Sequence, residues 1–270
     1  METITHMREF ASWGEYVDTA CGTSDWESRG SYTSGATWAG SESLEAAVAI
    51  SRTGWPEGVA MMQADMDIAA AQEDRTVRAR SYDVDGEEFD VEQWIEGSHE
   101  LFEIRERKRV TRRQVTLVVN GSAPSSVTPE TLTSYGAAIA SLVASIEEVG
   151  NQRVRILYEQ GGRKNGKRYV QRVVLKEVHD TLDLMQLAFP LIHPSALRRV
   201  CFAVLECTMT WKQADEEGFA YGYGGSVKDP AEDLKGEPNT YILPEVTTVD
   251  GHGPGGYRTT LLEWWDKANA

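Results

Sequence analysis

The sequence predicts an α/β fold, a sheet flanked by helices, preceded by an acidic and mainly helical amino-terminal region. From about residue 101, β-branched runs alternate with segments of helical periodicity, as in parallel sheets covered by helices. Residues 115–119, Val-Thr-Leu-Val-Val, form an apolar run typical of a buried central strand. A helix and a second strand follow, for which a right-handed parallel connection is the default. We therefore divide the chain into residues 1–100 and 101–270.

The amino-terminal region begins with an irregular segment rich in Gly, Ser and Thr, residues 21–40. We expect three aromatic side chains to anchor this segment, namely Trp26, Tyr32 and Trp38. Ser43 is placed to cap a helix that ends at Gly54. The remaining predicted elements are a turn over residues 55–58, a helix over 59–75 and a solvated acidic loop over 81–90.

The α/β region has its clearest helix signal directly after the first strand. Thr128 is a suitable N-cap, Pro129 suits the first helical position, and Gly150 suits the C-cap. Asn165-Gly166 predicts a tight turn between two antiparallel strands. The remaining predicted elements are strands over 153–158, 169–178 and 240–246, the last weakened by Pro244, and helices over 182–189, 194–207 and 257–267.

The net charge of −15 lies entirely in residues 1–100, where 21 acidic residues outnumber 6 basic ones. Residues 101–270 are neutral overall, with a basic stretch over 101–180 and an acidic end. Overall acidity argues against general binding of duplex DNA, whereas a local basic stretch can still meet phosphate groups.

The loop after the first predicted strand is the first candidate site. Its polar side chains lie at the carboxyl end of a central strand and just before a helix N-terminus, where ligands of open α/β sheets bind. The candidate ligand residues are Asn120, Ser122, Ser125 and Ser126. The alternative interpretation is a strand-to-helix turn whose polar residues cap the helix. Because the loop holds no carboxylate, we predict no metal there.

A basic turn is the second candidate site. Charges beside an aromatic ring suit single-stranded nucleic acid, because the charges follow the backbone while the ring stacks on a base. The candidate contacts are Arg163, Lys164, Lys167, Arg168 and Tyr169, with a second basic run over residues 105–113. The alternative is a soluble hairpin tip and a charged edge strand.

The sequence gives little support for a metal site, a hydrolase active site, disulfides or a membrane segment. The five histidines lack metal-ligand spacing, and no serine lies in a nucleophile-elbow sequence. The three cysteines are odd in number and scattered, so we expect no disulfide scaffold. The sequence also lacks an apolar run of about 18 residues and an export signal. We therefore expect a soluble cytosolic protein that is not an enzyme and holds neither cofactor nor metal.

Two resemblances add to these expectations. The motifs of the first are Trp38-Ala39-Gly40, Leu44-Glu45-Ala46-Ala47, Gly54-Trp55-Pro56-Glu57-Gly58, Leu182-Asp183-Leu184, Leu187-Ala188-Phe189 and His193-Pro194-Ser195-Ala196-Leu197-Arg198-Arg199. They resemble an uncharacterised family of tailed-bacteriophage proteins, which implies a protein of the infected host cytoplasm or of the virion.

The second resemblance covers residues 115–270, which are similar to a von Willebrand factor A-type domain, a Rossmann-like sheet wrapped by helices. In that family the loop after the first strand carries Asp-x-Ser-x-Ser and binds magnesium. This chain has Asn120-Gly121-Ser122-Ala123-Pro124 instead. The resemblance therefore implies a scaffold for protein interaction without the metal.

Together these observations predict a non-enzymatic bacteriophage protein that binds a phage or host protein and no membrane. The alternative is an accessory factor that binds single-stranded nucleic acid in phage replication or transcription. A degenerate hydrolase at the Asn120 loop is a third hypothesis.

Overall fold

The structure is a computed structural model of the full chain. The structure describes residues 3–27, 29–33, 35–73, 82–83, 88–89, 91–95, 97, 102–103, 113–148, 150, 152–164, 166–217, 219, 231–246 and 256–269. The chain divides into two units: the main unit, residues 1–67 with 113–270, and the small unit, residues 68–112.

The main unit is built on a mixed sheet of five strands in the order β1-β7-β6-β5-β8. The strands are β1 (Thr3–Phe10), β7 (Lys167–Lys176), β6 (Arg153–Lys164), β5 (Gln114–Asn120) and β8 (Thr240–Ile242). Neighbouring strands are parallel except for β6 and β7, which form an antiparallel hairpin. The predicted α/β class is confirmed.

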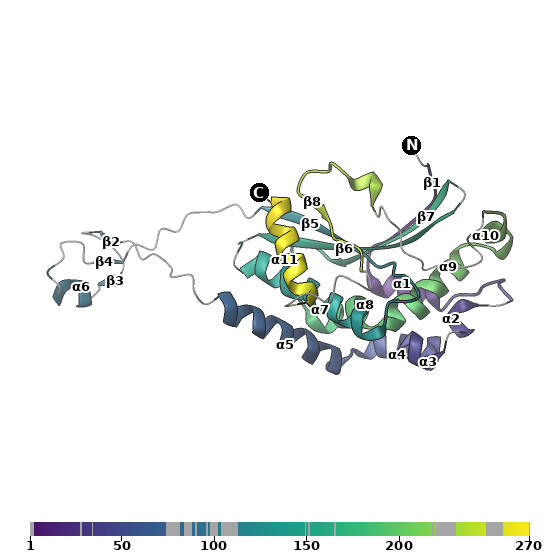
Figure 1. The fold of residues 1–270 in the computed structure, drawn as a ribbon, viewed down its shortest axis with the longest axis horizontal. Helices are drawn as coiled ribbons and strands as arrows, with labels where there is room; N and C mark the ends of the chain where they lie inside the picture. The colour runs from purple at the N-terminus through teal and green to yellow at the C-terminus, as the bar shows by residue number, and fades with distance from the viewer. Residues whose placement is uncertain are drawn as a thin grey trace. The chain divides into compact units, whose positions relative to one another are not determined.

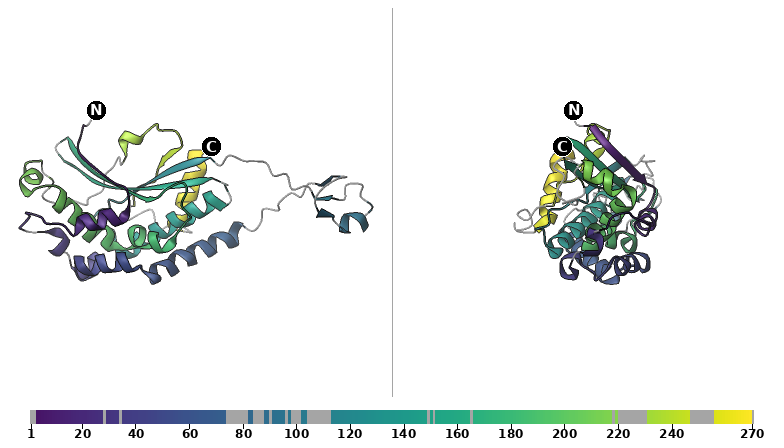
Figure 2. Two further views of the ribbon diagram at one scale, coloured as in Figure 1. Left: turned by 180° about the vertical axis from the view of Figure 1, so that it is seen from behind. Right: turned by 90° about the vertical axis from the view of Figure 1, so that its right-hand side faces the viewer.

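Helices cover one face of this sheet, and the short helix η2 (Glu232–Leu234) lies on the other (Figures 1 and 2). The covering helices include α1 (Trp13–Ala20), α7 (Pro129–Glu148), α8 (Leu184–Ile192), the π-helix η1 (Ala196–Cys201) and α9 (Phe202–Thr208). The main core lies between this layer and the sheet, with fully buried residues such as Leu117, Ile139 and Phe189. The remaining helices are α2 (Gly30–Thr33), α3 (Ala36–Ala39), α4 (Leu44–Thr53), α5 (Pro56–Glu73), α10 (Trp211–Glu217) and α11 (Gly256–Asn269).

Local capping signals gave accurate helix boundaries. The hydroxyl of Ser43 accepts a hydrogen bond from the backbone N–H of Ala46 at the start of α4. Gly54, just past its end, has a φ of 87°, which glycine adopts without strain. In the same way Thr128 accepts from the N–H of Thr131 at the start of α7. The predicted helices are confirmed at these ends.

Some predicted elements differ from the structure. The turn expected over residues 55–58 is already helical from Pro56, since proline fits the first position of a helix. The strand expected over 240–246 ends at Ile242, before Pro244, which has no N–H for a ladder. Of the three expected anchors, Trp26 is buried, Trp38 is half-buried and Tyr32 is exposed.

The division at residue 100 also differs from the structure. The strand β1, at the beginning of the predicted amino-terminal region, pairs in parallel with β7 over Thr3–Phe10. The compact units separate at residues 67/68 and 112/113 instead. Sequence spacing could not reveal this, because the partner of β1 lies more than 150 residues away in the chain.

The small unit contains a sheet of three short antiparallel strands in the order β2-β4-β3. These are β2 (Tyr82–Asp83), β4 (Phe102–Glu103) and β3 (Glu88–Phe89). The predicted solvated loop over 81–90 therefore contains two strands. The five-residue helix α6 (Val91–Ile95) follows β3.

Candidate functional site

The loop after β5 is closed by its own hydrogen bonds. Asn120 and Ser122 are both buried, and the side-chain oxygen of Asn120 accepts from the N–H of Ser122 at 3.0 Å. The Ser122 hydroxyl donates to the carbonyl of Gly161 and accepts from the N–H of Gly161, each at 3.1 Å. These two side chains join the end of β5 to β6, as a structural turn would.

The other two predicted ligand residues lie apart from this pair. Ser125 and Ser126 are exposed, and the carbonyl of Ser125 accepts from the indole of Trp38 at 2.9 Å. The structure therefore does not bring the four residues of the predicted loop together around one point.

The cavity at this end of β5 is small. Its volume is about 30 Å³, and its wall includes Asn120, Tyr158 and His193. Burial lowers the pKa of His193 to about 4, so its ring is neutral near pH 7, and Nδ1 accepts from the N–H of Ser195 at 3.1 Å. A space of this size holds about one water molecule. It does not hold a substrate.

The predicted nucleic-acid contacts are divided between the surface and the interior. Lys167 is exposed and lies 3.5 Å from Glu217. Arg168 and Tyr169 are each only 2% exposed, so neither faces a nucleic acid in this structure. The backbones of Arg163 and Lys164 belong to β6, while their side chains lie outside the described residues. Burial of Tyr169 corrects the expectation that its ring stacks on a base.

The second basic run falls almost wholly outside the described residues. Only Arg113 of residues 105–113 is described. Its guanidinium donates to the side-chain oxygen of Asn239 at 2.7 Å and to the hydroxyl of Tyr241 at 3.0 Å. Arg113 therefore ties the start of β5 to β8.

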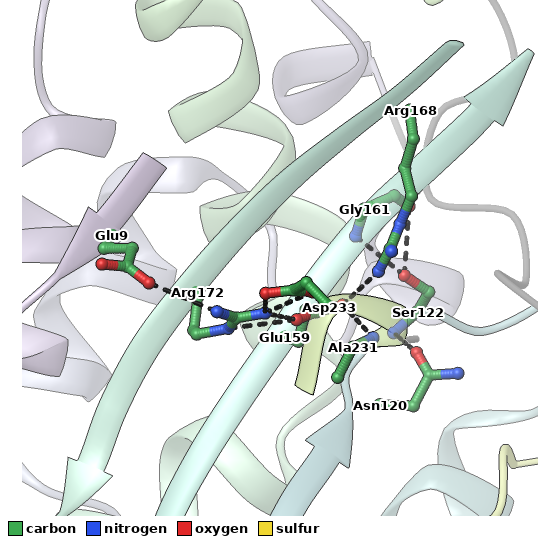
Figure 3. Close-up of polar contacts among 9 residues, drawn as sticks. All are labelled: Glu9, Asn120, Ser122, Glu159, Gly161, Arg168, Arg172, Ala231 and Asp233. Atoms are coloured by element: carbon green, nitrogen blue, oxygen red, sulfur yellow. Dashed lines mark hydrogen bonds and ion pairs between the residues drawn. The ribbon is translucent and has the colours of Figure 1, made fainter. Parts of the chain in front are cut away.

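A charged cluster with a buried centre lies on the face of the sheet opposite the helical layer (Figure 3). The cluster consists of Glu9, Glu159, Arg168, Arg172 and Asp233. Glu159, 2% exposed, accepts from Arg168 at 2.6 Å, from Arg172 at 2.7 and 3.1 Å, and from the N–H of Ala231 at 2.6 Å. One carboxylate thus holds two arginines and the backbone next to η2.

Arg172 is the most connected cation of this cluster. Besides Glu159 it contacts Asp233 at 2.9 Å and Glu9 of β1 at 3.3 Å. Burial lowers the pKa of Arg172, but hydrogen bonds to Glu159 and Asp233 outweigh burial, so the pKa lies above its usual value. The cluster joins β1, β6, β7 and the segment around η2. Glu159 in the apolar run of β6 was the sequence signal that could have revealed it, because a lone charge in a buried strand requires a partner.

Two larger clefts lie elsewhere on the main unit. A polar cleft of about 430 Å³ lies along β1, β7, α9 and α10 and is lined by His6, Met7, Arg8, Tyr169, Val170, Gln171, Leu205, Thr208, Met209 and Gln213. A more apolar cleft of about 360 Å³ lies at the start of α1 and includes Trp13, Arg52 and Lys176. Both exceed the lower limit of about 300 Å³ for small-molecule sites.

Two further features concern the described part of the chain. Within it, no three His, Cys, Asp or Glu side chains are grouped to hold a metal ion. No single described helix is long and apolar enough to cross a membrane; α8 together with η1 and α9, bent by 68°, passes on length and composition alone. That bent pair is largely buried in the core.

Comparison with known proteins identifies a family whose description names no activity. A family model described as "Domain of unknown function (DUF7192)" matches residues 2–255. No curated protein and no solved structure matches the chain.

Proposed function

Since the chain belongs to the family of the DUF7192 domain, whose description assigns no activity, we propose from its geometry that it is a non-enzymatic protein-interaction module, and from its sequence motifs that it is a protein of a tailed bacteriophage. The observation that carries the proposal is an apolar patch on α6. Val91, Trp94 and Ile95 are 55%, 62% and 74% exposed. Their spacing of three and four residues places them on one face of the helix. Exposed aromatic and aliphatic groups of this kind are typical of interaction sites.

The sequence around the apolar patch indicates the chemistry of the partner. Residues 81–100 contain eight acidic residues and neither lysine nor arginine. An apolar patch within an acidic segment suits a partner whose own apolar surface is flanked by basic groups. We propose that this partner is a phage or host protein in the infected cytoplasm.

The strand order supports the finer assignment to a von Willebrand factor A-like fold. Within the run β7-β6-β5-β8 only β7 is antiparallel to the other strands, as expected of that fold, while β1 pairs in parallel with β7 beyond this run. Asn120 and Ser122 occupy the positions of the first two metal-loop residues, where they are bonded within the protein. The cavity at the carboxyl end of β5 is too small for a substrate. This supports a scaffold for protein interaction rather than a hydrolase.

A charge on the apolar patch is expected to weaken partner capture. The immobilised protein is incubated with lysate of infected cells, and bound proteins are quantified by mass spectrometry. Trp94→Asp should lower capture of the specific partner about 30-fold, because a central Trp contributes about 2 kcal/mol or more. Met61→Asp, at a side chain of α5 that is 46% exposed, is the matched control and should leave capture unchanged.

Two outcomes would count against the interaction module. One is that no protein is enriched above an empty matrix. The other is that Trp94→Asp and Met61→Asp reduce capture equally, since the loss would then reflect general surface charge. Circular dichroism of both variants shows whether they keep the wild-type helix content.

Binding of single-stranded nucleic acid is the second candidate function. The polar cleft along β1 and β7 is the observation that favours this function. Exposed Arg8 lines this cleft, and exposed Lys167 begins the strand that forms one wall. The cleft is large enough for a nucleobase, and the two cations are suited to contact phosphates.

Binding of single strands is expected to weaken as salt rises. Anisotropy of a fluorescein-labelled 20-nucleotide oligo-dT is followed at 50 and 200 mM NaCl. Each phosphate contact contributes about −0.7 to the slope of log K against log salt, so Arg8→Glu/Lys167→Glu should make the slope shallower by about 1.4. Arg52→Glu, an exposed cation outside this cleft, should leave it unchanged. Absence of binding at 50 mM salt, or a salt-independent affinity, would exclude this function.

A further inference from the structure

Two of the three cysteines lie side by side in the fold. Cys21 ends α1, and Cys207 lies on α9, which packs against α1. The Cys207 sulfur is 3.3 Å from the carbonyl oxygen of Gly22 and 3.9 Å from that of Ala20. It therefore lies against both residues that flank Cys21.

Each thiol of this pair has an arginine beside it. The guanidinium of Arg52 is 3.9 Å from the Cys21 sulfur, and that of Arg29 is 3.9 Å from the Cys207 sulfur. The thiolate is the reactive form of a cysteine. Burial raises the pKa of the Cys207 thiol, and Arg29 opposes that shift. Glu206 and the nearby Cys21 add to the rise, so the pKa of Cys207 lies above its usual value.

Access distinguishes the two members of the pair. Cys21 is exposed, so a small oxidant can reach its sulfur, whereas Cys207 is half-buried. We infer that Cys21 and Cys207 form an oxidisable thiol pair, in which Cys21 reacts first with a low-molecular-weight disulfide and Cys207 then resolves the adduct.

The exchange is balanced in two steps. The Cys21 thiolate attacks one sulfur of the small disulfide, which forms a mixed disulfide and releases one thiolate. Cys207 then loses its proton to solvent and attacks the Cys21 sulfur, which releases the second thiolate. The protein dithiol loses two electrons, and the small disulfide is reduced to two thiols. The resulting bond would fasten the end of α1 to α9.

Cys201 serves as an internal control because its environment is the opposite. It is fully buried, its sulfur lies 3.8 Å from the Tyr158 hydroxyl, and burial raises its pKa to about 12. In the folded protein this thiol should stay reduced and unreactive.

The test uses the full chain and oxidised glutathione as the oxidant. We expect two of the three thiols to disappear, a tryptic peptide pair joined through Cys21 and Cys207, and a Tm higher by roughly 5–10 °C, since the bond closes a long loop. Dithiothreitol should reverse all three changes. Cys21→Ser should retain two free thiols under the same treatment, and Cys207→Ser should stop at a stable glutathione adduct on Cys21.

Three results would overturn the inference. Wild-type protein that stops at the glutathione adduct would show that the Cys207 sulfur cannot reach Cys21. Disulfide-linked dimers through Cys21 would show that the thiol reacts between molecules. Oxidation of Cys201 at the same rate as Cys21 would show that burial does not protect a thiol of this protein from oxidation, and that Cys21 and Cys207 are not a distinct reactive pair.

Discussion

Replacing Arg199 by methionine is expected to lower the free energy of unfolding by about 3–5 kcal/mol. Arg199 is fully buried in η1 and donates to the carbonyl oxygens of Ser31 at 2.6 Å, Ser41 at 2.8 Å and Glu42 at 3.2 Å. Methionine replaces the aliphatic part of the arginine side chain but has no donor, so these buried carbonyls would lose their partner. Burial lowers the pKa of Arg199, which reflects the cost of keeping this charge inside.

The neighbouring Arg198 contributes to the same attachment. It is 1% exposed, donates to the carbonyls of Trp38 and Val127, and stacks over the Trp38 ring at 4.2 Å. Burial lowers its pKa to about 10. The two arginines thus hold the segment from Ser31 to Glu42 on the core by its backbone. Because backbone carbonyls cannot be exchanged for apolar groups, methionine offers no compensating contact.

Urea unfolding followed by tryptophan fluorescence measures the loss. Arg52→Met, at an exposed arginine whose partner Asp18 is also exposed, is the matched control and should leave the midpoint unchanged. A change at Arg199 no larger than that of the control would mean that the carbonyls find other donors. In that case the arginine would not hold the segment.

Replacing Glu159 by glutamine is expected to cost about 3–5 kcal/mol of unfolding free energy, because it leaves buried arginines without their counter-charge. Arg168 is the more affected of the two, since Glu159 is its hydrogen-bond acceptor and its Nε and Nη1 atoms have no partner among the described residues. Arg172 keeps Asp233 and Glu9. The amide also adds a donor beside the N–H of Ala231, where the carboxylate accepted a hydrogen bond.

A double-mutant cycle isolates the interaction of Glu159 with Arg168. If the cost of Glu159→Gln comes from the orphaned charge, Arg168→Met should recover part of it in the double variant. Glu177→Gln, in the exposed pair with Arg155, is the control and should cost less than about 1 kcal/mol. Additive single-variant effects would contradict the interpretation, because the two side chains would then act independently.

The sequence by itself determined the elements whose signals are local. The helix α7 follows from the Thr128 cap, Pro129 and an apolar face of helical period, and α4 follows from Ser43 and Gly54. The apolar run of β5 predicted a central strand, and Asn165-Gly166 predicted the hairpin of β6 and β7. Each of these signals depends on residues only a few positions apart, which the backbone brings together in any fold.

Only the tertiary structure decided which polar side chains are internal. Tyr169 and Arg168 look like surface residues of a basic turn, yet Phe219 covers the ring of Tyr169 and Glu159 pairs with Arg168. Likewise β1 joins the sheet because β7 offers it a free edge. Cys207 meets the end of α1 because α9 packs there. The physical reason is common to all of them: burial of a charge or a thiol depends on a partner distant in the chain, and local spacing carries no information about that partner.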